Sequence, residues 1–476
     1  MTEVLVGPPS APTQDRPAGH PLAPLHDPGT MRRRCAAVLH AVEQNVSPSF
    51  KLNRAALGAV AERVASLTLR DHPTLVIPCH SHWHHFDSGG VSRMAELERR
   101  LAGRSAADAA RAHFDLAVVS VLMDVSAGVT WRYRESTPLS AAALPQAAPE
   151  DLLALLDRAA SARPGEPVAP DAPAANDAPA PCHAGSAGLA VACFRAFMAG
   201  AFSATPGDPC RADAAALRHV DAAALRAIFQ SSPSNPLAGL EGRAAALARL
   251  GGALQLEAAA DSARGHPAAA RPALLFDRIS AYGQRQAISA AEVLGEVLRV
   301  LTPIWPSGSK VQGLPAGDVW PHLWAGAEVG RGGQHRTTEG WVPLHTGGQW
   351  LTCTLLAPLQ AAGISVGALH DLTGLADCRS AGLLIDGGVI VPRDPRLLTR
   401  TWKLQDECII ELRALTLALL DELAALVQAR LGKTAQELPL ACRLQACIRA
   451  SGRELARELR SDTAAPLRFE HDAAAP

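Results

Sequence analysis

The chain has 476 residues and carries 45 lysines and arginines against 46 aspartates and glutamates, a formal net charge of −1. This balance argues against electrostatic binding to nucleic acid or to an anionic membrane surface. A hydrophobic content of 48% and a mean hydropathy of +0.06 fit a soluble globular enzyme, and no apolar run reaches the roughly 18 residues of a membrane span. The ten cysteines form no CxxC pair and the N-terminus has no secretory pattern, so we expect reduced thiols and a cytoplasmic protein.

Residues 1–30 are rich in Pro and Gly and predict a disordered tail. Helical periodicity begins at Met31 and defines an N-terminal helical part over residues 31–162. Within it, TLVIP (74–78) predicts a short buried strand or extended segment. The stretch at 113–128 is apolar on nearly every side, which predicts a buried helix.

Residues 163–183 are rich in Pro and Ala and predict a flexible loop. Residues 184–476 return to helical periodicity, and we expect this part to pack with residues 31–162 as one body. GGVIV (387–391) is its one convincing strand. The sequence therefore predicts a mainly α fold with a few short strands.

The familiar signatures of nucleotide binding, zinc proteases and serine hydrolases are absent from the sequence. The segment GRGGQHRTTEG (330–340) is Gly-rich and basic, as in a phosphate-binding loop. No helix follows it directly, so a mobile loop is the better interpretation.

The stretch PCHSHWHHFDSGG (78–90) concentrates four histidines. On an extended chain the alternating His80, His82 and His84 would point the same way and could bind Zn²⁺, with Asp87 as a fourth ligand or an orienting group. The alternative is a polar loop that lines a binding site without a metal, because tetrahedral sites usually recruit ligands from a second element.

Several charged residues lie among apolar neighbours, where a carboxylate can acquire a perturbed pKa. Asp377 and Arg379 occur in LADCRSAGLL (375–384), six residues after Asp371. An Asp–Arg ion pair that pins a turn would explain the same pattern. Other such positions are Asp318 in DVWPH, Glu241 in SPSNPLAGLEGR, and Glu411 and Arg413 at the start of a long helix.

Seven ordered motifs from about Met31 onward together resemble the fungal and bacterial uracil-catabolism protein four family. They are DLAVVSVLMD, GLAVACFRAFMAGAFS, FQSSPSNPLAGLEGR, GDVWPH, GQWLTCTLLAPL, LTGLADCRSAGLLIDGGV and ELRALTLALLDEL. The resemblance implies a role in degrading uracil through its ribonucleotide and a ribosylurea-type intermediate to urea.

A fainter similarity connects LTGLADCR and the neighbouring motifs with the queuosine-salvage N-glycosylases, which implies a helical body related to DNA glycosylases and cleavage of a base–ribose bond. Their catalytic carboxylate falls on Asp377 and their arginine on Arg379, while a lysine of that site falls near His345. This chain departs from both patterns. The lysine is missing, and Cys378 replaces a tyrosine.

The uracil-catabolism family has glutamate at the position of Asp377, and it has arginines at the positions of His82 and His84. Arginine does not bind metal, but arginine and protonated histidine both bind anions. This comparison favours an anion-binding loop without a metal. His80 and His85, which match the family, are then its expected functional pair.

The resemblance leads us to expect a metal-independent N-ribohydrolase, without a cofactor, that acts on a ureido-riboside or its 5′-phosphate. Asp377 would be the nucleophile or electrostatic stabiliser, Arg379 and Asp371 would orient it, and His345 or Gln349 would assist the leaving group. The expected substrate-binding residues are His80, His84, His85, Gln349, Glu241, Arg413 and Asp318. If the substrate carries a 5′-phosphate, the candidates to bind it are His80, His82, His84 and Arg413. A metal-assisted hydrolase of the opened pyrimidine ring and a non-catalytic partner of the pathway's enzymes remain alternatives.

Overall fold

Helices build most of the structure, and the strands are only two or three residues long. The computed structural model describes residues 21–128, 130–135, 181–282, 288–305, 309–326, 338–462 and 464–469. The predicted mainly α class is confirmed. Residues 163–180 of the predicted Pro/Ala loop, and most of the predicted loop at 330–340, lie outside the described residues.

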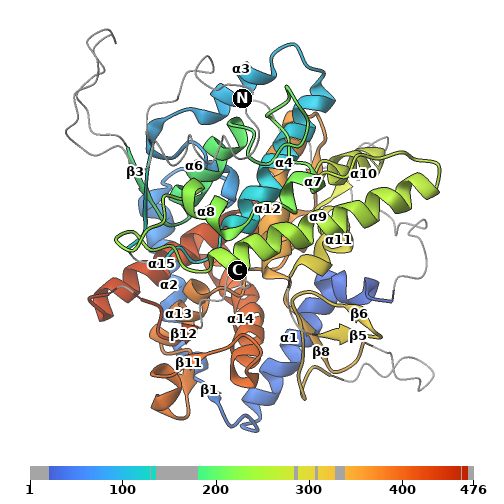
Figure 1. Cartoon of the computed structure of the whole chain (residues 1–476). Helices are drawn as coiled ribbons and strands as arrows, with labels where there is room; N and C mark the ends of the chain where they lie inside the picture. Colours follow the sequence, from blue (N-terminus) through green and yellow to red (C-terminus); the bar gives the residue numbers. More distant parts are fainter. Residues whose placement is uncertain are drawn as a thin grey trace, which may run out of the picture.

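A first group of helices surrounds α14 (Glu407–Leu431), which is buried along most of its length. Because α14 is apolar on nearly every side, it can be covered from several directions at once. Helices from the beginning of the chain pack against it beside helices from the end, so blue and red segments lie together in Figure 1. The other members of this α14 group are α1 (Pro28–Glu43), α2 (Leu57–Asp71), α13 (Cys378–Asp386) and α15 (Gln445–Leu459).

A second group surrounds α4 (Ala106–Met123), the helix predicted over 113–128. It begins earlier than predicted because the Ser105 side chain caps it, accepting a hydrogen bond from the backbone of Asp108. Around α4 and its neighbours lie α3 (Arg93–Leu101), α6 (Gly185–Met198), α7 (Ala214–Leu217), α8 (Ala222–Ile228), α9 (Leu240–Ala263), α10 (Leu274–Tyr282), α11 (Ala290–Leu301) and α12 (Thr346–Ala361).

A smaller apolar cluster joins the two groups. It includes Met31 of α1, Leu294 of α11, Cys353 of α12 and Cys442, which lies in a short π-helical segment, Leu440–Leu444 (η9). The two groups of helices therefore contact each other through a shared apolar interior. The candidate site described below lies at this junction, a common position for ligand sites.

Each described strand pairs with one other strand. The strand predicted in GGVIV is confirmed as β10, which pairs antiparallel with β1. The strand or extended segment predicted at 74–78 forms no strand, because the segment has no backbone partner in a sheet. The pairs are β1 (Phe50–Leu52) with β10 (Ile390–Pro392), β2 (Arg132–Arg134) with β3 (Cys182–Ala184), β4 (Ile288–Ser289) with β9 (Val366–Gly367), β5 (Lys310–Val311) with β6 (Leu314–Pro315), β7 (Val319–Pro321) with β8 (Trp341–Pro343), and β11 (Thr401–Trp402) with β12 (Arg468–Phe469).

Ordered structure begins earlier than the predicted tail of residues 1–30 allows. Residues 1–20 lie outside the described part, but Ala23–His26 form a 3-10 turn (η1) and α1 starts at Pro28. Leu22 and Leu25 are buried, and the Asp27 side chain caps α1. Two buried leucines in a segment rich in proline were too few to produce a periodic signal.

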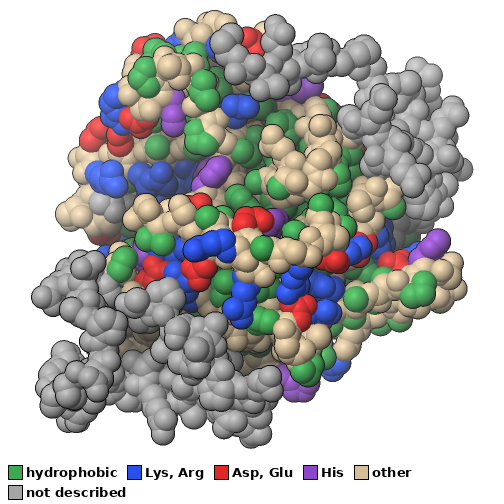
Figure 2. Space-filling view, turned by 90° about the horizontal axis from the view of Figure 1, so that it is seen from above, with side chains coloured by type: hydrophobic (Ala, Val, Ile, Leu, Met, Phe, Trp, Pro, Cys, Tyr) green, Lys and Arg blue, Asp and Glu red, His purple; other side chains and the backbone are tan. Residues whose placement is uncertain are grey.

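The molecular surface fits the balanced composition. Figure 2 shows positively and negatively charged side chains intermingled on the face in view. Among the described helices, none is long and apolar enough to cross a membrane.

The close packing of α15 against α13 generates a first prediction. A Cβ atom at Gly452 of α15 would lie 2.5 Å from the carbonyl oxygen of Arg379 in α13. Gly452→Ala should therefore force the helices apart and lower the free energy of unfolding by about 1–3 kcal/mol. Gly252→Ala, in α9 with open space around the added methyl group, should raise it by about 0.5–1 kcal/mol. Urea denaturation measures both changes, and equal stability of the two variants would contradict this view of the packing.

Candidate functional site

The buried segment Leu372–Asp377 has neither helical nor strand structure, so its backbone needs partners from elsewhere. Two glutamines supply them. Gln349 of α12 accepts a hydrogen bond from the backbone N–H of Thr373 at 3.0 Å and donates to the Thr373 hydroxyl. Gln445 of α15 accepts from the backbone N–H of Leu375 at 3.0 Å. The segment is thereby held rigidly where it leads into α13.

Asp377 is the N-cap of α13, and four hydrogen bonds hold its buried carboxylate. One oxygen accepts from the backbone N–H groups of Arg379 and Ser380, at 2.8 and 3.1 Å. The other accepts from the Ser380 hydroxyl at 3.0 Å and from Gln445 at 3.2 Å. This arrangement favours an oriented carboxylate over a free nucleophile, because both oxygens are engaged.

One arginine of α15 contacts this carboxylate, and two more follow it along the helix. Arg449 lies 3.8 Å from an Asp377 oxygen and 6.0 Å from the centre of the Trp350 ring of α12. Arg453 and Arg457 follow at intervals of four residues, so all three project from one face of the helix. We call Arg449, Arg453 and Arg457 the arginine ladder.

The histidine-rich stretch adopts a 3-10 turn, η3 (His82–His85), rather than the extended chain that the alternation suggested. Trp83 and Phe86 anchor the turn through an edge contact of their rings. The preceding residues dock on η9, where the backbone N–H of His80 donates to the carbonyl of Cys442 and Arg443 donates to the carbonyl of Ile77. In a 3-10 helix residues three apart lie above one another, so His82 and His85 share a side while His84 is exposed.

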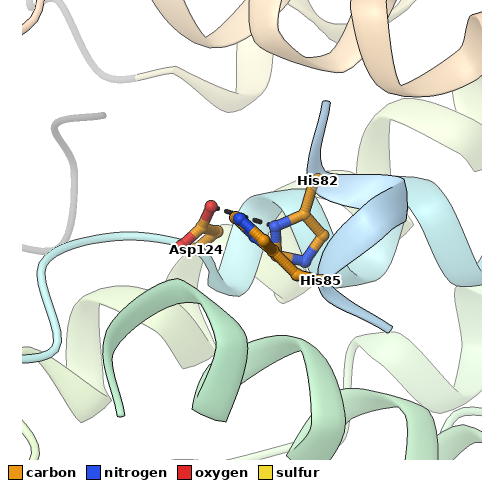
Figure 3. Close-up of side chains that lie close together, drawn as sticks. All are labelled: His82, His85 and Asp124. Atoms are coloured by element: carbon orange, nitrogen blue, oxygen red, sulfur yellow. Dashed lines mark hydrogen bonds and ion pairs between the residues drawn. The ribbon is translucent and has the colours of Figure 1, made fainter. Parts of the chain in front are cut away.

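Figure 3 shows the rings of His82 and His85 close to the carboxylate of Asp124, which follows α4. His82 Nδ1 lies 3.0 Å from Asp124, and its Nε2 lies 2.7 Å from the hydroxyl of Ser120. The ligand atoms of His82, His85 and Asp124 lie within 4.8 Å of one another, so these three could hold a metal ion. Both nitrogens of His82 already have partners, and Ser120 is fully buried, which excludes it as a nucleophile for a bound substrate.

The protonation of this region follows from burial and from neighbouring charges. Burial and the nearby Arg449 lower the pKa of His80 well below its usual value, and burial with the adjacent His82 lowers the pKa of His85 to about 4. Both rings are therefore neutral near pH 7. Burial opposes ionisation of Asp124, but its contact with His82 holds the pKa of Asp124 below the usual range.

Trp350 and Arg449 connect the histidine turn with Asp377. The Trp350 ring lies 4.7 Å from His80 and 6.4 Å from His85, and its indole N–H donates to Asp124 at 3.3 Å. Among the residues that the structure describes, His80 Nε2, His85 Nδ1 and Arg449 Nε are buried and have no hydrogen-bond partner. We call Asp377, Arg449, Trp350, His80 and His85 the Asp377 cluster.

A second buried network lies at the start of α12. Arg413 of α14 makes a bidentate ion pair with Asp318, at 2.8 and 2.7 Å, and also donates to the Thr346 hydroxyl. Despite burial, the Arg413 guanidinium holds the pKa of Asp318 at about 2. His345 bonds the carbonyl of Leu25 through Nε2, and burial lowers its pKa to about 4.

The structure brings only some of the predicted site residues together. Asp377, His80 and His85 share the Asp377 cluster, and Arg379 follows Asp377 directly. Gln349 supports the segment that leads to Asp377, while the contacts of His345, Arg413 and Asp318 belong to the second network. Asp371, His84 and Glu241 are exposed on the surface. Asp371 lies 3.6 Å from His370, and Glu241 lies in the first turn of α9.

Several residues of the site escaped sequence reasoning. Arg449 and Arg453 had a usable signal, since arginines at spacing four on a helix form a positive face. Asp124 and Trp350 had none, because only the packing of α4 against α12 brings them to the histidines. In the GLEGR motif the buried charged residue is Arg243 instead of Glu241, and its side chain donates to the carbonyls of Met123 and Val125 at the end of α4.

Comparison with known proteins gives consistent matches along most of the chain. Residues 24–143 and 179–475 match a family model described as a protein of unknown function, DUF1688. "Protein urg3" of Schizosaccharomyces pombe is 30% identical over 451 residues, covering 93% of this chain and 96% of that protein. "Uracil catabolism protein 4" of Lachancea kluyveri is 29% identical over 475 residues, covering 94% and 97%.

The second network predicts a large effect on stability. Asp318→Ala leaves the Arg413 guanidinium buried without its counter-charge, so the free energy of unfolding should fall by about 3–5 kcal/mol. Glu458→Gln is the control, because it removes one partner of the exposed Arg63–Glu458 pair and should leave the urea midpoint unchanged. Equal midpoints for Asp318→Ala and the parent chain would show that Arg413 does not depend on this carboxylate.

Proposed function

Because the chain belongs to the DUF1688 family, and one similar protein is named for uracil catabolism, we propose that it acts in pyrimidine degradation as an N-ribohydrolase. The proposed substrate is a ureido-riboside or its 5′-phosphate. Water adds across the bond between the anomeric carbon and nitrogen: the carbon gains a hydroxyl group, and the nitrogen leaves with a proton as urea. The products are urea and ribose or its 5-phosphate.

The observation that carries this proposal is the oriented carboxylate of Asp377. Cleavage of an N-ribosyl bond passes through a transition state resembling an oxocarbenium ion, which a fixed negative charge stabilises. Hydrogen bonds to both oxygens fix Asp377 before substrate binds, so little reorganisation is needed during the reaction. They also favour electrostatic stabilisation over formation of a covalent intermediate.

His80 and His85 are the proposed partners of the urea group and of the attacking water. Each ring is neutral near pH 7 and has a buried nitrogen without a partner, and a neutral imidazole can donate from one nitrogen and accept at the other. They replace His345 and Gln349, which were expected to assist the leaving group. Gln349 is engaged with Thr373, and His345 lies in the second network, where its Nε2 bonds the carbonyl of Leu25.

Burial of the Asp377 cluster supports an enzyme rather than a non-catalytic partner of the pathway. A regulator would be expected to show Asp377 in a surface ion pair, whereas 9% of Asp377 is exposed and its neighbour Arg449 retains an unpartnered nitrogen. The metal-assisted alternative has less support, because both ring nitrogens of His82 are already hydrogen-bonded.

The proposal is tested by measuring urea released from ribosylurea and from its 5′-phosphate. Asp377→Asn keeps an N-cap acceptor but removes the charge, and should lower kcat/KM about 100-fold or more. Asp221→Asn is the matched control, because Asp221 caps α8 in the same way on an exposed surface, and its activity should equal that of the parent. Release of no urea by the parent chain from either compound would refute the activity, and full activity of Asp377→Asn would refute the assigned role.

A further inference from the structure

Two members of the arginine ladder, Arg453 and Arg457, differ in their pairing from many other arginines of this fold. The acids of the same helix pair elsewhere: Glu454 contacts Arg70 at 2.6 Å and Glu458 contacts Arg63 at 2.8 Å, both on α2. Within the described part of the chain, Arg453 and Arg457 make no hydrogen bond or ion pair. The helix thus directs Glu454 and Glu458 toward α2, while Arg453 and Arg457 lie on another face without an ion pair among the described residues.

The positive charge is concentrated where the helix meets α13. Arg449 is half-buried, with one ion pair to Asp377 that is longer than a hydrogen bond. Partial desolvation and the neighbouring guanidinium groups of Arg449 and Arg379 lower the pKa of Arg453. Several like charges held close together repel one another, and this repulsion is relieved when an anion binds among them.

We propose that the arginine ladder binds a phosphate monoester, which makes the 5′-phosphate, rather than the free riboside, the substrate. The identity of the bound compound rests on the proposed N-ribohydrolase activity, whereas the binding of a phosphate monoester by the arginine ladder does not. Guanidinium groups match phosphate oxygens in geometry as well as charge. Arg453 lies one helical turn, about 6 Å along the axis, beyond Arg449. A ribosyl group with its anomeric carbon beside Asp377 would therefore bring its 5′-phosphate within reach of Arg453.

The sequence also predicts a site that binds an anion. We place this anion site on the arginine ladder of α15 instead of on the residues predicted from the sequence. The phosphate was expected on His80, His82, His84 and Arg413. Arg413 is saturated by Asp318 and Thr346, His82 by Asp124 and Ser120, and His84 is exposed.

Calorimetric titration with ribose 5-phosphate, ribose and inorganic phosphate tests the inference without requiring catalysis. The parent chain should bind ribose 5-phosphate at least about ten-fold more tightly than ribose, and rising salt should weaken the difference. Arg453→Gln, at an exposed position where the fold should tolerate it, should weaken ribose 5-phosphate binding about 10- to 100-fold and leave ribose binding unchanged. Arg99→Gln on α3, an equal change of charge at an exposed arginine without an acidic partner, should change neither.

The outcomes separate this inference from the proposed activity. Equal affinity for ribose 5-phosphate and ribose, or an equal effect of Arg453→Gln and Arg99→Gln, would overturn the phosphate site even if ribosylurea is hydrolysed. Ladder-dependent binding of ribose 5-phosphate without release of urea would support the phosphate site and refute the activity. Binding of inorganic phosphate that is insensitive to Arg453→Gln would place the anion elsewhere and also overturn the inference.

Discussion

The hydrogen-bonding requirement of one buried, irregular segment shapes the candidate site. Backbone groups of residues 372–377 cannot reach water and have no helix or strand partner, so side chains must satisfy them. Gln445 does this for Leu375 and also donates to the carboxylate of Asp377. One side chain of α15 therefore positions both the segment and the acid. The absence of a side chain at Gly452 then lets α15 approach α13 closely enough to make these contacts.

The Arg413–Asp318 network and the arginine ladder differ in whether their charges are paired. Arg413 and Asp318 satisfy each other bidentately, and this arrangement serves the fold. On α15, Arg449 makes an ion pair with Asp377, whose carboxylate already accepts four hydrogen bonds, and Arg453 and Arg457 make no ion pair among the described residues. Unpaired like charges that lie close together favour the binding of a ligand of opposite charge, because the ligand supplies the missing interaction.

Sequence reasoning succeeded where a periodic pattern or a motif carries the information. Helical spacing predicted the helices and the mainly α class, and GGVIV predicted β10 because its apolar β-branched residues follow a glycine turn. The same reasoning failed at 74–78, where an apolar run forms no strand without a partner. The alternation of His80, His82 and His84 does not place their side chains on one side, since this stretch forms a 3-10 turn instead of an extended chain.

The sequence by itself determined the class of fold and the membership of the family, because periodicity and motifs are local properties of the chain. Tertiary structure decided which polar residues meet. It placed Arg449 and Trp350 between Asp377 and the histidines, paired Arg413 with Asp318, and left Asp371, His84 and Glu241 on the surface. The physical reason is that burial and charge pairing depend on neighbours far apart in the chain, whose distances are set only when the two groups of helices pack together.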